Sequence, residues 1–198
     1  MRNRLIALAS AATLAIGSIT GCSTTSKPAD ATPAAKRQSI DAAVDAALAQ
    51  LYAQDPAARE LVAKARGTLV FPSVVSAGFV VGGSYGEGEL RSVSSNDRIP
   101  APAIMYYKTA AASVGLLAGA ESKSVFILFM TQEALDKFKA SNGWTVGADA
   151  SVSMMKVGAN AGVDTSTAQS AVLGYVLTKG GLMANLSLEG TKVTPLEL

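Results

Sequence analysis

The sequence predicts an α+β domain in which N-terminal helices pack on a strongly curved, mostly antiparallel, barrel-like sheet. Apolar residues recur at helical spacing only near residues 39–66 and 131–140, and the remaining domain consists of short β-branched and aromatic segments. No helix-forming segment follows each strand, which disfavours a parallel α/β arrangement. Glycines lie within many of the strand-like segments, and they indicate the bulges and close backbone packing that strong curvature requires.

The first 21 residues have the pattern of a bacterial export signal. Arg2 and Arg4 give a positive start, and residues 5–16 form an apolar run that is too short to span a bilayer core of about 30 Å as a helix. The run is followed by Ile19-Thr20-Gly21-Cys22, which resembles the lipobox of bacterial lipoproteins. This resemblance implies cleavage before Cys22, attachment of acyl chains such as palmitate to that cysteine, and a lipid-anchored protein of the cell envelope.

The only cysteine of the chain lies where the apolar run ends, which favours lipidation of Cys22. The alternative is a free thiol in a secretory signal that is cleaved elsewhere. A single cysteine cannot form an internal disulfide. Ser23 rather than aspartate follows the cysteine, and by analogy with enteric bacteria this predicts an outer-membrane location, facing the periplasm or the surface.

Charge and composition exclude several classes of function. The chain has 17 Lys and Arg against 15 Asp and Glu, and removal of Arg2 and Arg4 with the signal leaves 15 of each. A net charge of zero disfavours nucleic acid as a partner, because phosphate recognition needs a basic surface. The chain has no histidine, which excludes Ser-His-Asp, Cys-His and His-metal chemistry. We therefore expect a protein that is not an enzyme and holds no cofactor or metal.

Residues 22–38 are rich in Ser, Thr, Pro and Ala, and they predict a flexible tether that carries the lipidated Cys22. The folded domain is expected to span residues 39–198. Its first helix is predicted to begin after Ser39 as N-cap. The apolar residues at helical spacing in that helix are Ile40, Val44, Leu48 and Leu51.

A second, short helix is predicted after Asp55 as N-cap and Pro56 as first residue, with Glu60 and Lys64 paired four residues apart and Gly67 as its stop. After it we expect short strands joined by turns, at residues 68–71, 78–81, 104–109 and 124–130. One further helix is predicted at 131–140. In the last third, Val146, Ala148, Ala150 and Val152 alternate as in a strand, and residues 171–188 predict a hairpin with its turn at 179–181.

The segment from Gly82 to Gly88 (GGSYGEG) superficially resembles a phosphate-binding loop. It lacks a Gly-Lys-Ser/Thr ending and the Gly-x-Gly-x-x-Gly register, so structural glycines in a hairpin or bulge are the favoured interpretation. Glu87 and Glu89 are two residues apart and share one face of a strand. Paired carboxylates for acid–base chemistry or a hard cation are one interpretation, and a solvated strand face is the favoured one.

Other polar groups give weaker signals. Asp149, Asn160 and Asp164 lie in a stretch without EF-hand spacing, and we expect loop and turn roles for them. Ser153 and Lys156 match the letters of Ser-x-x-Lys, but the alternation there predicts a strand rather than a nucleophile. Four aromatic residues are expected to pack in the core or an interface, with contact to a lipid or a partner as the alternative: Tyr106, Tyr107, Phe138 and Trp144.

Five glycine-containing segments follow one another between residues 61 and 194. They are ARGTLVFP (65–72), SAGFVVGGSYGEG (76–88), SVGLLAGA (113–120), VGADAS (146–151) and KGGLMANLSLEG (179–190). Their content and order resemble the successive blocks of the SYLF-domain family, known in fungi and animals also as an actin-regulator domain. The resemblance implies a phospholipid-binding module without catalytic residues.

In eukaryotic members of that family, membrane binding is attributed to an N-terminal amphipathic helix and a basic surface, with phosphoinositides as ligands. The helix predicted here has no Lys or Arg between Ile40 and Ala58, so only the broader idea of lipid contact applies to it. We therefore expect an envelope-anchored bacterial lipoprotein with a phospholipid-binding SYLF-like domain, with lipid contacts at Lys36, Arg37 and Lys179. The alternative is a non-enzymatic protein-interaction or scaffolding module with an envelope protein as partner, held at the membrane only by its acyl chains.

Overall fold

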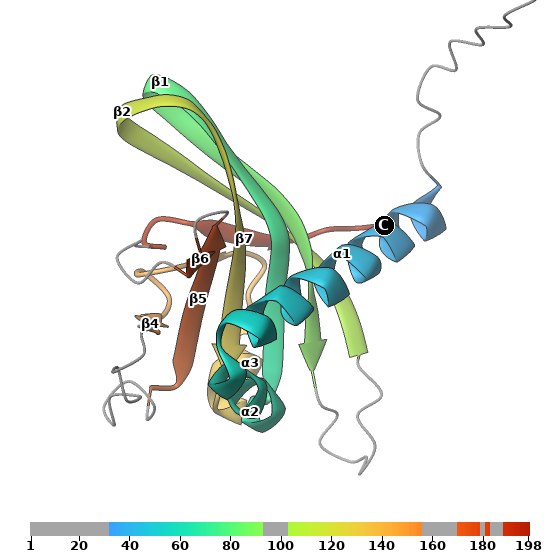
Figure 1. Ribbon diagram of the computed structural model, residues 1–198. Helices are drawn as coiled ribbons and strands as arrows, with labels where there is room; N and C mark the ends of the chain where they lie inside the picture. The colour runs from blue at the N-terminus through green and yellow to red at the C-terminus, as the bar shows by residue number, and fades with distance from the viewer. Residues whose placement is uncertain (1–31, 93–102, 156–169, 179–180, 183–187) are drawn as a thin grey trace, which may run out of the picture. The chain divides into compact units, whose positions relative to one another are not determined.

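A computed structural model describes residues 32–92, 103–155, 170–178, 181–182 and 188–198 (Figure 1). All of them belong to one compact unit, Ala31–Leu198. The helices are α1 (Pro33–Gln54), α2 (Pro56–Lys64) and α3 (Gln132–Ala140). The strands are β1 (Gly67–Ser92), β2 (Ala103–Phe129), β3 (Trp144–Thr145), β4 (Ser153–Met154), β5 (Val172–Thr178), β6 (Gly181–Leu182) and β7 (Lys192–Pro195).

The described strands form one curved sheet of seven strands, antiparallel except where β4 pairs with β5 (Figure 1). β1 pairs with β2 along nearly its whole length, from Gly67 opposite Phe129 to Ser92 opposite Ala103. The other edge of β2 pairs with β7 near one end and with β5 near the other. The predicted α+β class, with N-terminal helices on a strongly curved and mostly antiparallel sheet, is confirmed.

Side chains of the central strands enter two apolar clusters, one on each face of the sheet. In β2, Val125, Ile127 and Phe129 join a first cluster that includes residues of α3. Phe126 and Leu128 join a second cluster with the apolar residues of α1. Successive side chains of a strand point to opposite faces, so a strand buried on both faces has a continuous apolar sequence, as residues 125–129 do.

The first helix begins earlier than expected. Thr32 is the N-cap, its hydroxyl accepts a hydrogen bond from the Ala35 amide, and Pro33 is the first helical residue, a position where proline costs no backbone hydrogen bond. Ser39 therefore lies within α1, and residues 33–38 of the expected tether are helical. Residues 22–31 of that tether, including Cys22, and the expected signal at 1–21 lie outside the described residues.

The apolar face of α1 is the predicted one, since its buried residues include Ile40, Val44, Leu48 and Leu51. For α2, the predicted cap is confirmed, because the Asp55 side chain accepts a hydrogen bond from the Ala57 amide. The expected Glu60–Lys64 pair forms, at 3.7 Å. The predicted stop is wrong: α2 ends at Lys64, and Gly67 instead begins β1.

The expectation of several short strands before residue 130 is wrong. The segments at 68–71 and 78–81 are parts of β1, and those at 104–109 and 124–130 lie in or end β2. The intervening Pro, Gly and Ser residues do not end the strands, because two register shifts, between Phe71 and Val74 and between Gly78 and Val80, accommodate them. A bulge absorbs an unpaired residue at the cost of a local bend and leaves the strand intact on both sides.

The alternating segment after β3 forms a turn rather than the predicted strand. Gly147 has a φ of 89°, and the Thr145 amide donates a hydrogen bond to Asp149 Oδ2 at 2.6 Å. This is the turn role expected for Asp149. The later hairpin is confirmed where it is described, since β5 pairs with β6 through Leu177 and Leu182. Its turn at 179–180 and residues 183–187 lie outside the described residues.

Candidate ligand-binding groove

β1 folds back on itself, so that it forms two arms. The first arm comprises residues 67–77 and the second comprises residues 83–92, and residues 78–82 form the bend between them (Figure 1). At the bend, a Cβ atom on Gly78 would lie 2.3 Å from the Cα atom of Gly82. No residue with a side chain fits at position 78 without movement of the backbone, because real Cβ atoms do not approach other atoms more closely than 3.0 Å.

The two arms also cross, and glycines lie at the crossing. A Cβ atom on Gly88 would lie 2.0 Å from the Val70 carbonyl oxygen, and one on Gly86 would lie 2.9 Å from the Ser73 carbonyl oxygen. The predicted structural role of the glycines in the GGSYGEG segment is thus confirmed at Gly86 and Gly88. These glycines allow the two arms of one strand to approach closely, and they do not lie in a hairpin turn.

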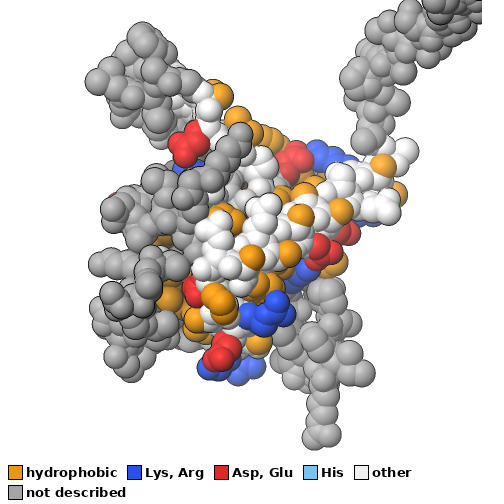
Figure 2. Space-filling view, in the orientation of Figure 1, with side chains coloured by type: hydrophobic (Ala, Val, Ile, Leu, Met, Phe, Trp, Pro, Cys, Tyr) orange, Lys and Arg blue, Asp and Glu red, His pale blue; other side chains and the backbone are white. Residues whose placement is uncertain are grey.

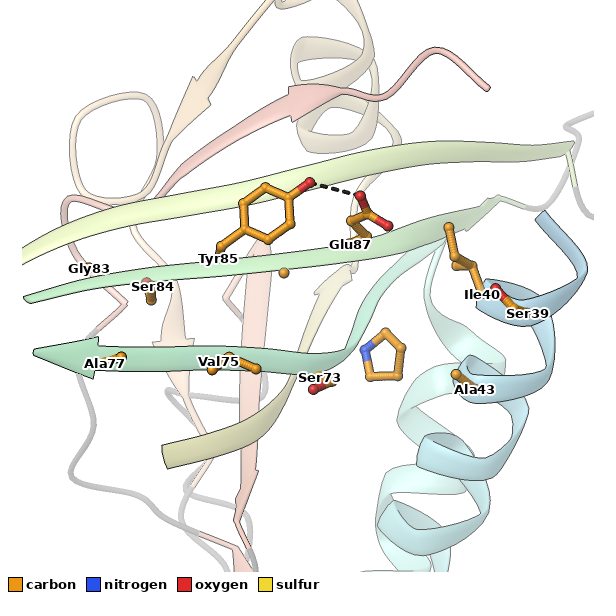
Figure 3. Close-up of a pocket in the computed structure, with 12 residues that line it drawn as sticks. Ser39, Ile40, Ala43, Ser73, Val75, Ala77, Gly83, Ser84, Tyr85 and Glu87 are labelled. Atoms are coloured by element: carbon orange, nitrogen blue, oxygen red, sulfur yellow. Dashed lines mark hydrogen bonds between the residues drawn. The ribbon is translucent and has the colours of Figure 1, made fainter. Parts of the chain in front are cut away.

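A groove of about 680 Å³ lies between the two arms and the first half of α1 (Figure 3). Its walls are mostly apolar. From α1 it receives Ile40 and Ala43, from the first arm Val75 and Ala77, and from the second arm Gly83 and Tyr85. Ile40 also belongs to the buried cluster beneath α1, so one wall of the groove is fixed by the core.

Glu87 is the charged residue of the groove, and it joins β1 to α1. Its Oε1 atom accepts a hydrogen bond from the Tyr85 hydroxyl at 2.8 Å (Figure 3). The same atom accepts a hydrogen bond from Lys36 Nζ, also at 2.8 Å. Although burial by itself raises the pKa of the Glu87 carboxyl, these two donors hold that pKa below its ordinary value. Burial and the hydrogen bond to Glu87 raise the pKa of Tyr85 to about 12. The groove thus combines apolar walls with a neutral hydroxyl and a paired carboxylate.

A second polar cluster fixes α1 on the sheet below the groove. Arg91 donates hydrogen bonds to Glu89 Oε1 on its own strand and to Asp45 Oδ1 on α1, the latter at 2.7 Å. The Tyr106 hydroxyl donates to Asp41 Oδ1 at 2.9 Å. Glu89 has no exposed surface, and its Oε2 atom has no hydrogen-bond partner. Burial, together with the neighbouring Asp41 carboxyl, raises the pKa of Glu89 to about 7 against the opposing effect of Arg91.

The favoured interpretation of Glu87 and Glu89 as a solvated strand face is therefore wrong. Glu89 is buried and Glu87 is half-buried, because α1 covers this part of β1. The sequence does contain a pattern that indicates burial of these carboxylates beneath α1. Asp41 and Asp45 are four residues apart on α1 and directly follow its buried Ile40 and Val44, a spacing that places both carboxylates beside the packed face.

Two of the expected lipid-contact residues have partners within the domain. Lys36 pairs with Glu87, and Arg37 Nη2 donates a hydrogen bond to the main-chain oxygen of Leu198. Both lie on the first turns of α1, beside the groove lined by Ser39 and Ile40. Lys179 and Cys22 lie outside the described residues. Lys36 and Arg37 thus lie side by side, but the positive charge of Lys36 is paired with the Glu87 carboxylate of the same domain.

The aromatic residues pack as expected. Phe138 lies between Phe129, at 4.8 Å between ring centroids, and Trp144, at 5.4 Å, and it contacts Tyr107 at 4.9 Å. Tyr106 is half-buried against the second cluster. Tyr107, Phe129 and Trp144 thus anchor Phe138 of α3 to the sheet. None of the four predicted aromatic residues lines the groove.

Other candidate chemistry is not assembled by the described part of the chain. No group of three acidic or cysteine side chains there has the geometry of a metal site. Ser153 Oγ shares a hydrogen bond of 2.7 Å with Ser170 Oγ, and Lys156, Asn160 and Asp164 lie outside the described residues. Among the described helices, none combines the length and the apolar character needed to cross a membrane.

Positive and negative side chains are interspersed on the face that contains α1. Figure 2 shows Lys and Arg beside Asp and Glu along this face rather than a surface of one sign. The Lys36–Glu87 and Arg91–Asp45 pairs account for part of this pattern. This face offers no basic surface for nucleic acid, in keeping with the net charge expected after cleavage.

The fold and the groove together define an α+β domain with an apolar groove between a helix and a folded strand. The model of one protein family, Ysc84, described as Las17-binding protein actin regulator, matches residues 110–197. This stretch is similar to the Ysc84 (SYLF) family, and the resemblance found in the sequence is confirmed over these residues. The match includes the last three of the five segments and ends before Leu198. Comparison with curated proteins gives no match.

Proposed function

We propose that this chain is a bacterial envelope lipoprotein, anchored through acyl chains on Cys22, whose domain binds phospholipid. The groove is the observation that supports the proposal. Its volume of about 680 Å³ lies within the range of about 300–1,000 Å³ that is typical of sites for small molecules. Apolar walls suit an acyl chain, and the Tyr85 hydroxyl and Glu87 carboxylate are polar groups that suit the uncharged and positively charged parts of a head group.

In this proposal, the acyl chains attach the protein to the membrane, and the groove binds lipid separately. Two or more acyl chains on one residue suffice for stable membrane attachment, since each buried CH₂ group contributes about 0.8 kcal/mol. The lipid chains on Cys22 hold the protein at the outer membrane, and the domain contacts lipid separately through its own surface. A domain that only needed attachment would have no use for an apolar groove of this size.

The experiment that tests the proposal is sedimentation with vesicles. The chain from residue 22 onward, with Cys22→Ser, contains the whole compact unit from Ala31 to Leu198 and carries no lipid. We expect it to sediment with phosphatidylcholine vesicles, with and without phosphatidylglycerol, at both 0.1 M and 1 M NaCl, because apolar contacts are not screened by salt. Binding that disappears at high salt would point to a charged surface instead, and no sedimentation under any condition would contradict phospholipid binding by the domain.

An Ala43→Trp variant is expected to reduce the binding of a single-chain lipid to the groove at least tenfold. Ala43 lines the groove and is exposed there, so an indole fills the space without disturbing the core. The measurement is titration with a fluorescent fatty acid below its micelle concentration. Ala49→Trp on the same helix is the matched control, because Ala49 is exposed and does not line the groove. Equal affinity of both variants and the parent would mean that the groove does not hold the chain.

The second candidate function is a tethered protein-interaction module. The observation that favours it is the outer edge of β1, since β1 pairs with β2 alone among the described strands. Such an edge presents unpaired backbone groups to which a partner strand can add. Absence of vesicle binding in the sedimentation experiment, with a partner retained by the lipid-free chain, is the result that would favour this function over the first.

A further inference from the structure

The bend of β1 lies within a ribbon that has no charge. Residues 77–86 of β1 and 109–120 of β2 contain no Lys, Arg, Asp or Glu, and the two segments pair with each other around the bend. Charged residues reappear only at its boundaries, where Glu87 pairs opposite Lys108 and Ser76 pairs opposite Glu121. We refer to residues 77–86 and 109–120 as the apolar ribbon.

Large apolar side chains are exposed on and beside this ribbon. Val81, within the bend, is 66% exposed, Val75 is 48% exposed and Tyr85 is 50% exposed. Tyr85 and Val75 also line the groove, so the groove runs along the arms toward the bend (Figure 3). A cluster of exposed apolar residues that adjoins a ligand site is unusual on a surface that meets only water.

The length of the apolar ribbon fits shallow insertion into a lipid surface. Val80 in the bend is four positions after Ser76, whose partner is Glu121, and at about 3.3 Å per residue this is about 13 Å. Elements that lie in the membrane interface reach a depth of about 5–10 Å. The bend can therefore enter to this depth while Glu121, Glu87 and Lys108 stay at the aqueous side.

The backbone limits how deep the ribbon can go. The described strands place no partner on the outer edge of β1 or, at residues 111–122, on the second edge of β2. Unpaired backbone groups are not tolerated in the hydrocarbon core. At the boundary between head groups and acyl chains, water and ester oxygens can satisfy them. Along the described edges, insertion at this boundary is therefore more favourable than a deeper position.

We propose that the apolar ribbon inserts its bend into the head-group boundary of a phospholipid bilayer and thereby places the groove at the lipid surface. This inference rests on the proposed phospholipid binding and adds to it the element that enters the membrane. An acyl chain would then pass from the bilayer to the groove along Val75 and Tyr85 without crossing open water. Insertion of this kind needs no basic surface, which agrees with the mixed charges of the face in Figure 2.

The test places an environment-sensitive fluorophore at the bend. In the lipid-free chain with Cys22→Ser no cysteine remains, so Val81→Cys provides the only thiol for an NBD label. We expect NBD emission at position 81 to increase and shift to shorter wavelength on addition of phosphatidylcholine vesicles, equally at 0.1 M and 1 M NaCl. A label introduced by Ala46→Cys on exposed α1 is the matched control and should not respond.

A second variant tests the contribution to binding. Val81→Asp is expected to reduce vesicle sedimentation about tenfold, because it replaces apolar burial with a charge at the insertion point. The position is 66% exposed, so the fold should persist, as the emission of the buried Trp144 will show. Sedimentation without any response at position 81, and unchanged by Val81→Asp, would overturn this inference and leave phospholipid binding intact.

Two further outcomes have distinct meanings. No sedimentation of the parent chain under any condition would overturn the proposed function and this inference together. An NBD response at position 81 that needs no vesicles and grows with protein concentration would show that the ribbon pairs with a second copy of the chain, which would also overturn the inference.

Discussion

A Gly88→Ala variant is expected to lose about 3 kcal/mol or more of its free energy of unfolding, because overpacking against rigid backbone is among the costliest single substitutions. The added Cβ atom would lie 2.0 Å from the Val70 carbonyl oxygen and 2.8 Å from Phe71 Cδ1. Val70 and Phe71 are fully or almost fully buried, so neither arm can shift without disturbing one of the two apolar clusters. Urea unfolding, followed by the fluorescence of Trp144, measures the effect.

Gly83→Ala on the same strand is the matched control. A Cβ atom there would meet only the Ala111 carbonyl oxygen, at an ordinary distance of 3.7 Å, and position 83 is exposed. We expect its free energy of unfolding to stay within about 0.5 kcal/mol of the parent, as for most surface substitutions. Similar stabilities for Gly88→Ala and Gly83→Ala would show that the two arms of β1 do not cross at Gly88. The groove between the arms would then have no structural basis.

Between about pH 4.5 and 7, the free energy of unfolding is expected to fall by about 3 kcal/mol as the pH rises. The source is Glu89, whose pKa is raised to about 7 by burial and by the Asp41 carboxyl, although Arg91 opposes the shift. Because its pKa in the folded protein exceeds that in the unfolded chain, the folded protein binds more protons in this range. The stabilisation is complete below about pH 4.5 and is lost as the pH rises through about 7.

The chain suits this measurement because it has no histidine, the side chain that ordinarily titrates in this range. A Glu89→Gln variant keeps the shape of the side chain and removes its titration, so its stability should be nearly constant from pH 5 to 7. Arg91 retains Asp45 as partner in this variant. Glu87→Gln is the matched control and should keep the slope, because the pKa of Glu87 is lowered. An unchanged slope in Glu89→Gln would show that another group titrates.

The buried polar cluster also bears on the groove. Asp41, Asp45, Arg91 and Tyr106 attach α1 to the sheet, and Ile40 and Ala43 of the same helix form one wall of the groove. Arg91 also contacts Glu89, so we expect a change of charge at Glu89 to act on the contacts that hold this wall. Binding of the fluorescent fatty acid should accordingly be measured at fixed pH on each side of 7.

Much of the fold is readable from local pattern in the sequence. The spacing of Ile40, Val44, Leu48 and Leu51 predicts the packed face of α1, because helical periodicity determines which residues meet a neighbour. Asp55 and Thr131 cap α2 and α3, since their side chains accept hydrogen bonds from nearby amides. These features involve residues within a few positions of each other, and so sequence spacing alone specifies them.

The boundaries of the strands were less predictable. β1 contains glycine, proline and serine, which are common in turns, and the sequence therefore predicts several short strands in this region. In the structure they form bulges and a bend within one strand that stays paired with β2. These residue types occur both in turns that end a strand and in bulges within a strand. Which of the two forms depends on whether the neighbouring strand, here β2, continues to pair beyond them.

Local sequence pattern is enough to predict the α+β class, the presence of the three helices, the Asp55 cap of α2, the apolar strand at residues 125–129 and the family resemblance. The lack of histidine likewise follows from the sequence alone. Three features cannot be predicted from local pattern: β1 folds back on itself, a groove lies between its arms and α1, and Glu89 is buried. Each of these depends on contacts between residues far apart in the chain, as between Arg91 and Asp45. Local periodicity predicts which face of a strand is apolar, but it does not predict which element covers that face.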